Sequence, residues 1–172
     1  MHILLTGKPG VGKTTAIIRI VERLQALGVD VAGFYTQEIR DRGKRVGFGI
    51  TTVPDGRTGI LSHVEFSSPH RIGRYRVDVA GFEAIVLPIL GARDVDVLVI
   101  DEIGPMELLS RRFERAVLAA LERPKPRVVG VVQQKRLALV EGIKQVRIYR
   151  LDTRNRDRAP DEIVNMLGYR DL

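Results

Sequence analysis

Two patterns of apolar residues alternate along the chain. Short aliphatic and β-branched runs, such as 95–100, are typical of strands buried on both faces of a sheet. Between such runs, apolar residues recur at spacings of three and four, as in Ile17, Val21 and Leu24, which predicts helices with one buried face. The expected strands are 3–6, 29–35, 45–52, 57–64, 95–100, 128–132 and 146–151, and the expected helices are 15–27, 82–90, 107–121, 137–143 and one from Pro160. This alternation predicts an α/β fold, with a mostly parallel sheet flanked by helices.

One pair of the expected strands differs from the rest. Segments 45–52 and 57–64 follow each other directly and are joined by Pro54-Asp55-Gly56, which are strong turn residues. Strands joined by so short a connection pair antiparallel. We therefore expect an antiparallel hairpin added at one edge of the parallel sheet.

Length and composition fit one domain. The 172 residues have 44% hydrophobic and 28% charged residues, which is typical of a globular domain, so we expect a single domain over 1–172. No apolar run reaches the length of a membrane span, and no export signal is visible. The absence of Cys excludes disulfides and thiolate zinc sites. We expect no membrane association and, by default, a cytoplasmic location.

The formal net charge is +7, and the positive residues are mostly Arg. They are scattered among acids, and aromatic residues make up only 5%, which leaves little surface for stacking against single-stranded nucleic acid. We favour a heat-tolerant protein with surface ion pairs, and a nucleic-acid partner is the less favoured interpretation.

A phosphate-binding loop lies between the first expected strand and the first expected helix. Gly7-Lys8-Pro9-Gly10-Val11-Gly12-Lys13-Thr14 fits the P-loop pattern at every constrained position. In this pattern, glycines let backbone N–H groups surround phosphate oxygens, and the helix adds its positive end. We expect Lys13 to reach the β- and γ-phosphates, Thr14 to offer its hydroxyl to Mg²⁺, and Thr15 to contact the α-phosphate.

Two acids end the most hydrophobic strand. Asp101 and Glu102 follow 97–100 directly, at the carboxyl end where ligands gather in parallel sheets. We expect Asp101 to hold Mg²⁺ through a water molecule and Glu102 to accept a proton from the attacking water. The alternative is that Glu102 is a solvated charge at the end of a strand.

With these motifs in place, the chain resembles the small thermostable nucleoside triphosphatases, which also occur as cancer-related NTPases in animals (the THEP1 family). The resemblance covers essentially the whole chain. Its most specific segment is Asp101-Glu102-Ile103-Gly104-Pro105-Met106-Glu107-Leu108, and further matching segments are Gly33-Phe34-Tyr35-Thr36-Gln37-Glu38, Arg45-Val46-Gly47-Phe48, Gly73-Arg74-Tyr75-Arg76-Val77-Asp78, Leu137-Ala138-Leu139-Val140-Glu141 and Asn155-Arg156-Asp157.

The resemblance implies a monomeric, RecA-like P-loop domain that hydrolyses ATP, GTP and other nucleoside triphosphates to the diphosphate and phosphate. It also implies nucleotide contacts from two segments. They are Gly7, Lys8, Pro9, Gly10, Val11, Gly12, Lys13 and Thr14, and Leu98, Val99, Ile100, Asp101, Glu102, Ile103, Gly104 and Pro105. The chain departs from the expected family pattern at Gly49, His63 and Pro105, which puts the hairpin and the strand-end loop in question but leaves the phosphate site intact.

Hydrolysis also needs a cation at the γ-phosphate, such as an arginine finger. Segment 152–158 contains three arginines, of which we choose Arg156; Arg40, Arg45 and a partner protein are the other sources. Asn155 contacts the base or caps a turn. Gln133 and Gln134 end a strand near the same edge, where they could sense the γ-phosphate, but we favour their interpretation as ordinary loop residues.

Three other functions share these motifs. The first is a phosphotransferase, in which Glu102 deprotonates a hydroxyl acceptor. The second is an NTP-driven protein associated with RNA or DNA, and the third is a nucleotide-dependent switch. Release of free phosphate from ATP without an added acceptor distinguishes a hydrolase from a phosphotransferase.

Overall fold

The computed structural model describes residues 1–170, and within them nine strands form one sheet in the order β5-β6-β4-β3-β2-β7-β8-β1-β9. The strands are β1 (His2–Thr6), β2 (Val31–Asp41), β3 (Lys44–Val53), β4 (Thr58–His63), β5 (Arg71–Ile72), β6 (Tyr75–Val77), β7 (Val97–Ile103), β8 (Arg127–Val132) and β9 (Val146–Arg150). Neighbouring strands from β2 to β9 in this order pair parallel, whereas β3, β4, β6 and β5 pair antiparallel beyond β2. The predicted α/β fold with an antiparallel addition at one edge is confirmed.

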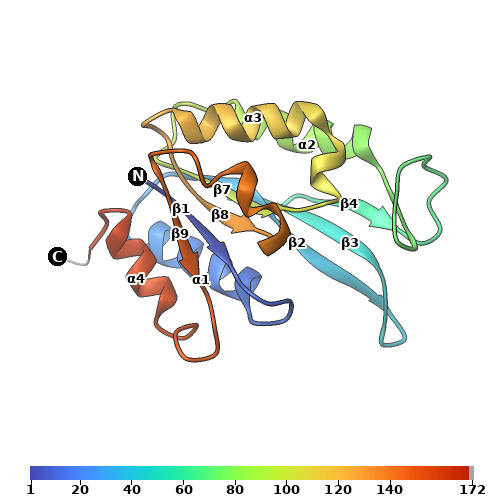
Figure 1. Ribbon diagram of the computed structural model, residues 1–172, viewed down its shortest axis with the longest axis horizontal. Helices are drawn as coiled ribbons and strands as arrows, with labels where there is room; N and C mark the ends of the chain where they lie inside the picture. Colours follow the sequence, from blue (N-terminus) through green and yellow to red (C-terminus); the bar gives the residue numbers. More distant parts are fainter. Residues whose placement is uncertain (171–172) are drawn as a thin grey trace.

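Helices cover both faces of the sheet, as Figure 1 shows. They are α1 (Lys13–Ala26), α2 (Val79–Leu90), α3 (Arg111–Glu122) and α4 (Ala159–Met166), with 3₁₀ turns η1 (Glu107–Leu109) and η2 (Gln134–Leu139). One buried cluster lies beneath α1 and α4, and a second lies beneath α2 and α3. Each of Ile3, Leu4 and Leu5 is fully buried, because alternate side chains of β1 enter the two clusters. None of the helices in residues 1–170 is both long and apolar enough to span a membrane.

The structure corrects three of the expected elements. The helix expected at 107–121 is divided, because the Ser110 side chain accepts a hydrogen bond from the Phe113 backbone N–H and so begins a new helix, α3. The helix expected at 137–143 is instead the 3₁₀ segment η2, which has no fully buried residue to stabilise a longer helix. The strand expected at 29–35 continues to Asp41, where Arg42 and Gly43 both adopt positive φ and form a tight turn into β3.

His2 joins three elements of the core through its buried imidazole. Its Nε2 lies 2.8 Å from the Arg123 carbonyl oxygen, and its Nδ1 accepts a hydrogen bond of 2.9 Å from the Val128 N–H. These two partners require a neutral ring that carries its proton on Nε2. Burial lowers the pKa of His2, because the charged ring loses its hydration. A protonated ring would also place a second N–H against the Val128 N–H.

This arrangement predicts that acid weakens the fold through His2. Its folded-state pKa lies below the ordinary value of 6.5, so the stabilisation is complete above pH 6.5 and is lost as pH falls through the folded pKa. We expect His2→Asn to lower the melting temperature at pH 8. At pH 5 the difference in melting temperature between His2→Asn and the wild type should be smaller. Thermal unfolding across this pH range measures both effects, with the exposed His70→Asn as control. An unchanged difference between wild type and His2→Asn at the two pH values would refute the proposed titration.

Candidate functional site

The P-loop connects β1 to α1 at the carboxyl edge of the parallel strands. Gly10 and Gly12 adopt φ values of 78° and 108°, which side chains on L-residues strongly disfavour. A Cβ on Gly7 would lie 2.6 Å from the Leu151 carbonyl oxygen, so the loop also packs closely against the segment that follows β9. Lys8, Pro9 and Gly10 are exposed, and Val11 is buried beneath them. The loop is therefore anchored from below and open above, as a phosphate cradle requires.

Lys13 folds back over this loop. Its ammonium group donates hydrogen bonds to the Gly7 carbonyl oxygen at 2.8 Å and to the Lys8 carbonyl oxygen at 3.0 Å. Burial lowers the pKa of Lys13, while the charges of Glu102 and Asp101 act in the opposite direction. The ammonium group thus contacts the backbone of the P-loop and is close enough to the two acids of β7 to interact with their charges.

Asp101 is a buried acid that faces this loop. It is only 1% exposed, and its Oδ2 has no hydrogen-bond partner among the described residues. The pKa of Asp101 is raised to about 7, mainly by burial. The charge of Glu102 adds to this rise, while the neighbouring Thr14 hydroxyl and the charge of Lys13 act in the opposite direction. A buried carboxylate oxygen without a partner, next to a P-loop hydroxyl, fits the oxygen ligands that Mg²⁺ takes.

No three His, Cys, Asp or Glu side chains in residues 1–170 gather as a metal-binding cluster. A P-loop magnesium site does not need one, because the metal takes one hydroxyl, one carboxylate, phosphate oxygens and water. Thr14 and Asp101 are therefore sufficient as the protein ligands of such an ion.

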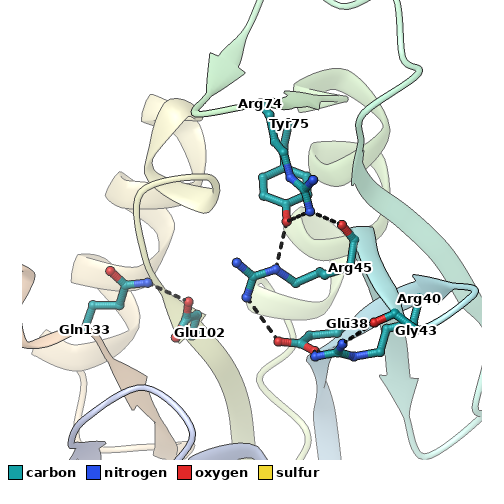
Figure 2. A network of polar contacts seen from close by, with 8 residues as sticks. All are labelled: Glu38, Arg40, Gly43, Arg45, Arg74, Tyr75, Glu102 and Gln133. Carbon is teal, nitrogen blue, oxygen red and sulfur yellow. Dashed lines mark hydrogen bonds and ion pairs between the residues drawn. The ribbon is translucent and has the colours of Figure 1, made fainter.

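Glu102 lies at a bulge in β7. The register with β8 passes from Asp101 opposite Val131 to Ile103 opposite Val132, which leaves Glu102 as the extra residue. Its Oε1 accepts a hydrogen bond of 2.9 Å from the Gln133 amide, at the end of β8 (Figure 2). The interpretation of Gln133 as an ordinary loop residue therefore misses its contact with Glu102. Gln134, in contrast, is exposed, as an ordinary loop residue would be.

A third acid, Glu107, lies behind Glu102. It is 3% exposed, and its Oε2 has no partner among the described residues. Burial raises the pKa of Glu107 well above its ordinary value, and the charges of Glu102 and Asp101 raise it further. A Cβ on Gly104 would lie 2.8 Å from Glu102 Oε1 and 3.0 Å from Glu107 Oε2. A larger residue at this position would have to displace one or both carboxylate groups.

The strand-end segment divides into two parts. Leu98, Val99, Ile100 and Ile103 are fully buried, and their side chains pack in the core. Asp101, Glu102, Gly104 and Pro105 lie beyond them at the edge of the sheet, and Pro105 is partly exposed. The aliphatic residues hold the acids in position, and the acids and the following loop face the P-loop.

The arginine-rich segment 152–158 lies on the other side of the P-loop. Nη1 of Arg156 donates to the Val11 carbonyl oxygen at 3.4 Å, and Arg158 pairs with Glu162 at 2.8 Å. Asn155 accepts from the Asp152 N–H and donates to the Arg150 carbonyl oxygen, so in this structure its side chain caps a turn. Arg156 therefore reaches the P-loop backbone, on the side of β1 that faces away from β7.

The chain is similar to known proteins over nearly its whole length. The sequence model of the NTPase family matches residues 2–164. The chain is 41% identical over 174 residues to the nucleoside-triphosphatase THEP1 of Thermotoga sp. (strain RQ2), which covers 98% of this chain and 97% of that protein. It is 42% identical over 180 residues to the cancer-related nucleoside-triphosphatase of Homo sapiens, which covers 95% and 94%.

Two solved structures share the fold over almost their whole length. The crystal structure of THEP1 from the hyperthermophile Aquifex aeolicus superposes with a TM-score of 0.85 at 36% identity, covering 97% of this chain and 99% of that one. The solution structure of the human cancer-related nucleoside triphosphatase gives a TM-score of 0.81 at 40% identity, covering 99% of each chain.

The burial of Asp101 predicts an effect on stability. Because its folded-state pKa of about 7 lies above the ordinary 3.8, the folded protein loses stability as pH rises from 4 to 7. Asp101→Asn should therefore raise the melting temperature by several degrees at pH 8, and by less at pH 4. Thermal unfolding without divalent metal measures this, and the exposed Asp94→Asn is the control. A lower melting temperature for Asp101→Asn at pH 8 would mean that the buried carboxylate stabilises the fold.

Proposed function

We propose that this chain, which belongs to the NTPase family and is a nucleoside-triphosphatase, hydrolyses ATP, GTP and other nucleoside triphosphates to the diphosphate and phosphate with bound Mg²⁺. The observation that carries this proposal is the position of Lys13 on the P-loop carbonyls, where its charge also interacts with the carboxylates of β7. A triphosphate that replaces the carbonyl contacts of Lys13 would lie between the P-loop and Glu102.

In this arrangement each side chain has one role. Lys13 exchanges the Gly7 and Lys8 carbonyl oxygens for the β- and γ-phosphate oxygens, so the phosphate takes contacts that the loop already makes. Thr14 and Asp101 hold Mg²⁺, which neutralises charge on the phosphates when bound. Glu102 accepts the proton of the attacking water, and the Gln133 amide fixes the orientation of its carboxylate.

The protein groups proposed for the reaction all come from one chain. Arg156 supports the P-loop through the Val11 carbonyl oxygen, and the exposed Thr15 adds a contact to the α-phosphate. Asn155 stays available to a base only if its turn opens, because both ends of its amide are occupied. Backbone and phosphate contacts do not distinguish bases, which supports broad nucleotide tolerance.

The direct test is release of phosphate from ATP, GTP, CTP and UTP with Mg²⁺ and no acceptor. We expect turnover of all four, and we expect Lys13→Ala to abolish it while the melting temperature stays within a few degrees. Lys144→Ala, which removes an exposed lysine, is the matched control. Phosphate transfer that appears only with an added hydroxyl acceptor would favour a phosphotransferase, and stimulation by RNA would favour a nucleic-acid partner.

The roles of Glu102 and Gln133 predict a graded loss of kcat. Glu102→Gln should lower kcat by roughly 10² or more, the scale of a lost general base, and leave the affinity for MgATP nearly unchanged. Gln133→Leu should lower kcat by about tenfold, since it removes only the hydrogen bond that orients Glu102. Single-turnover kinetics and calorimetry separate the two quantities, with Glu141→Gln as control. Normal kcat with weakened binding in Glu102→Gln would make Glu102 a binding residue.

A further inference from the structure

The proposed hydrolysis leaves one requirement open, and the inference below rests on that proposed function. Negative charge on the terminal phosphate has to be balanced by a cation in addition to Lys13 and the metal. The terminal phosphate of a bound nucleotide would lie toward Glu102, which is on β7. The cation should therefore come from the part of the sheet next to β7.

Two groups of arginines lie toward this edge of the sheet, and the strand order places them on opposite sides of the P-loop. One group is in segment 152–158, and the other is in the β2–β3 hairpin. Segment 152–158 follows β9, which lies beyond β1 on the side away from β7. At about 4.8 Å between neighbouring strands, three strand spacings put β9 roughly 14 Å from β7. Arg156 on this segment contacts the P-loop backbone, and Arg158 pairs with Glu162. These arginines are placed to support the P-loop from the far side.

The β2–β3 hairpin lies on the near side, because β2 is the direct neighbour of β7. Phe34 of β2 is level with Ile100, and β2 then continues to Asp41 and returns as β3 from Lys44. Figure 1 shows this hairpin projecting past the end of the parallel strands, in the same direction as the P-loop. Two arginines of this hairpin, Arg40 and Arg45, make side-chain hydrogen bonds.

Of these two arginines, only Arg45 has a guanidinium nitrogen without a hydrogen-bond partner in residues 1–170. Arg40 donates through Nε and Nη2 to Glu38 and through Nη1 to the Gly43 carbonyl oxygen. Arg45 donates through Nε to Tyr75 Oη at 2.8 Å and through Nη1 to Glu38 Oε1 at 3.1 Å. Within residues 1–170, Nη2 of Arg45 has no partner, and in Figure 2 this end points to the side on which Glu102 and Gln133 lie.

Arg45 is also held in place before any ligand arrives. Its guanidinium lies 5.2 Å from the centre of the Phe48 ring and 5.6 Å from the centre of the Tyr75 ring. Arg74 stacks on Tyr75 at 5.2 Å and donates to the same Tyr75 oxygen at 3.2 Å. Since stacking and hydrogen bonding restrict the rotamers of Arg45, little further conformational entropy is lost when it binds an anion.

We propose that Arg45 is the arginine that contacts the terminal phosphate of the bound triphosphate, and that Tyr75 and Glu38 are its positioning residues. Nη1 donates to Glu38 Oε1, which holds the plane of the guanidinium, and Nη2 beside it is left to donate to a phosphate oxygen. A guanidinium presents such a pair of N–H groups to two oxygens at once, which an ammonium group does not. Arg45 therefore distinguishes a triphosphate from a diphosphate.

The test compares Arg45→Ala and Arg45→Lys with the control Arg57→Ala. Arg57 is an exposed arginine in the turn that follows β3, so its substitution removes the same charge at a distant place. Calorimetry measures the affinities for Mg²⁺ with ADP and with the β,γ-imido analogue of ATP, and phosphate release gives kcat. We expect Arg45→Ala to lose at least tenfold in affinity for the imido-triphosphate, to keep its ADP affinity within about twofold, and to lose on the order of 10³-fold in kcat.

Further variants distinguish positioning from bulk charge. Arg45→Lys should recover less than a tenth of the lost kcat, and Tyr75→Phe should lower kcat about tenfold with an unchanged melting temperature. If Arg45→Ala kept its preference for the triphosphate, or lost ADP affinity to the same extent, the assignment would be wrong. The two proposals can fail separately. If the wild type bound the triphosphate more tightly than ADP, and Arg45→Ala abolished this preference, the Arg45 contact would be supported even if the wild type released no phosphate. The absence of phosphate release would refute only the proposed hydrolysis.

Discussion

The whole site depends on how β8 pairs with its two neighbours. Val131 of β8 lies opposite Leu5 of β1 on one side and opposite Asp101 of β7 on the other. This register makes the P-loop begin just beyond the level at which the acids of β7 emerge from the sheet. Shifting one strand by a single residue would turn its aliphatic side chains from one core cluster to the other, so burial of the two clusters fixes the register. The hydrophobic core thus determines where Lys13 meets Asp101 and Glu102.

The polar groups at this edge are arranged at the expense of stability. Asp101 and Glu107 are buried, and each has a carboxylate oxygen without a partner among residues 1–170, although burial of an acid usually requires full hydrogen bonding. Lys13 partly compensates for Asp101, but it is itself partly buried and hydrogen-bonds to its own loop. Such a set of strained electrostatic environments is typical of functional sites, where a ligand later supplies the missing partners.

The sequence predicts the parts of the site that depend on local patterns. The P-loop, its strand and its helix follow from spacing and glycine positions within 3–27, and Asp101 and Glu102 follow from their place at the end of an aliphatic run. Gln133, Glu107 and Arg45 depend on contacts between distant elements, which no local pattern reports. Glu107 looks like a first-turn acid of a helix, and Arg45 belongs to a hairpin whose first strand was expected to end at residue 35. The Gly43 turn was the local signal for that longer strand, because a glycine after Arg42 permits the positive φ of a two-residue hairpin.

The two arginine groups explain why the antiparallel strands matter to a parallel-sheet site. A parallel sheet offers only loops at its carboxyl edge, and a loop such as 152–158 has to be ordered by its own turn contacts, as Asn155 shows. The β2–β3 hairpin instead carries side chains past this edge on a hydrogen-bonded ladder, so Arg45 is placed by strand pairing and by the ring of Tyr75. Tyr75 comes from β6, which pairs with β4 and so connects the outer strands to the same wall. The antiparallel addition therefore acts as a rigid support that faces the P-loop across the proposed nucleotide site.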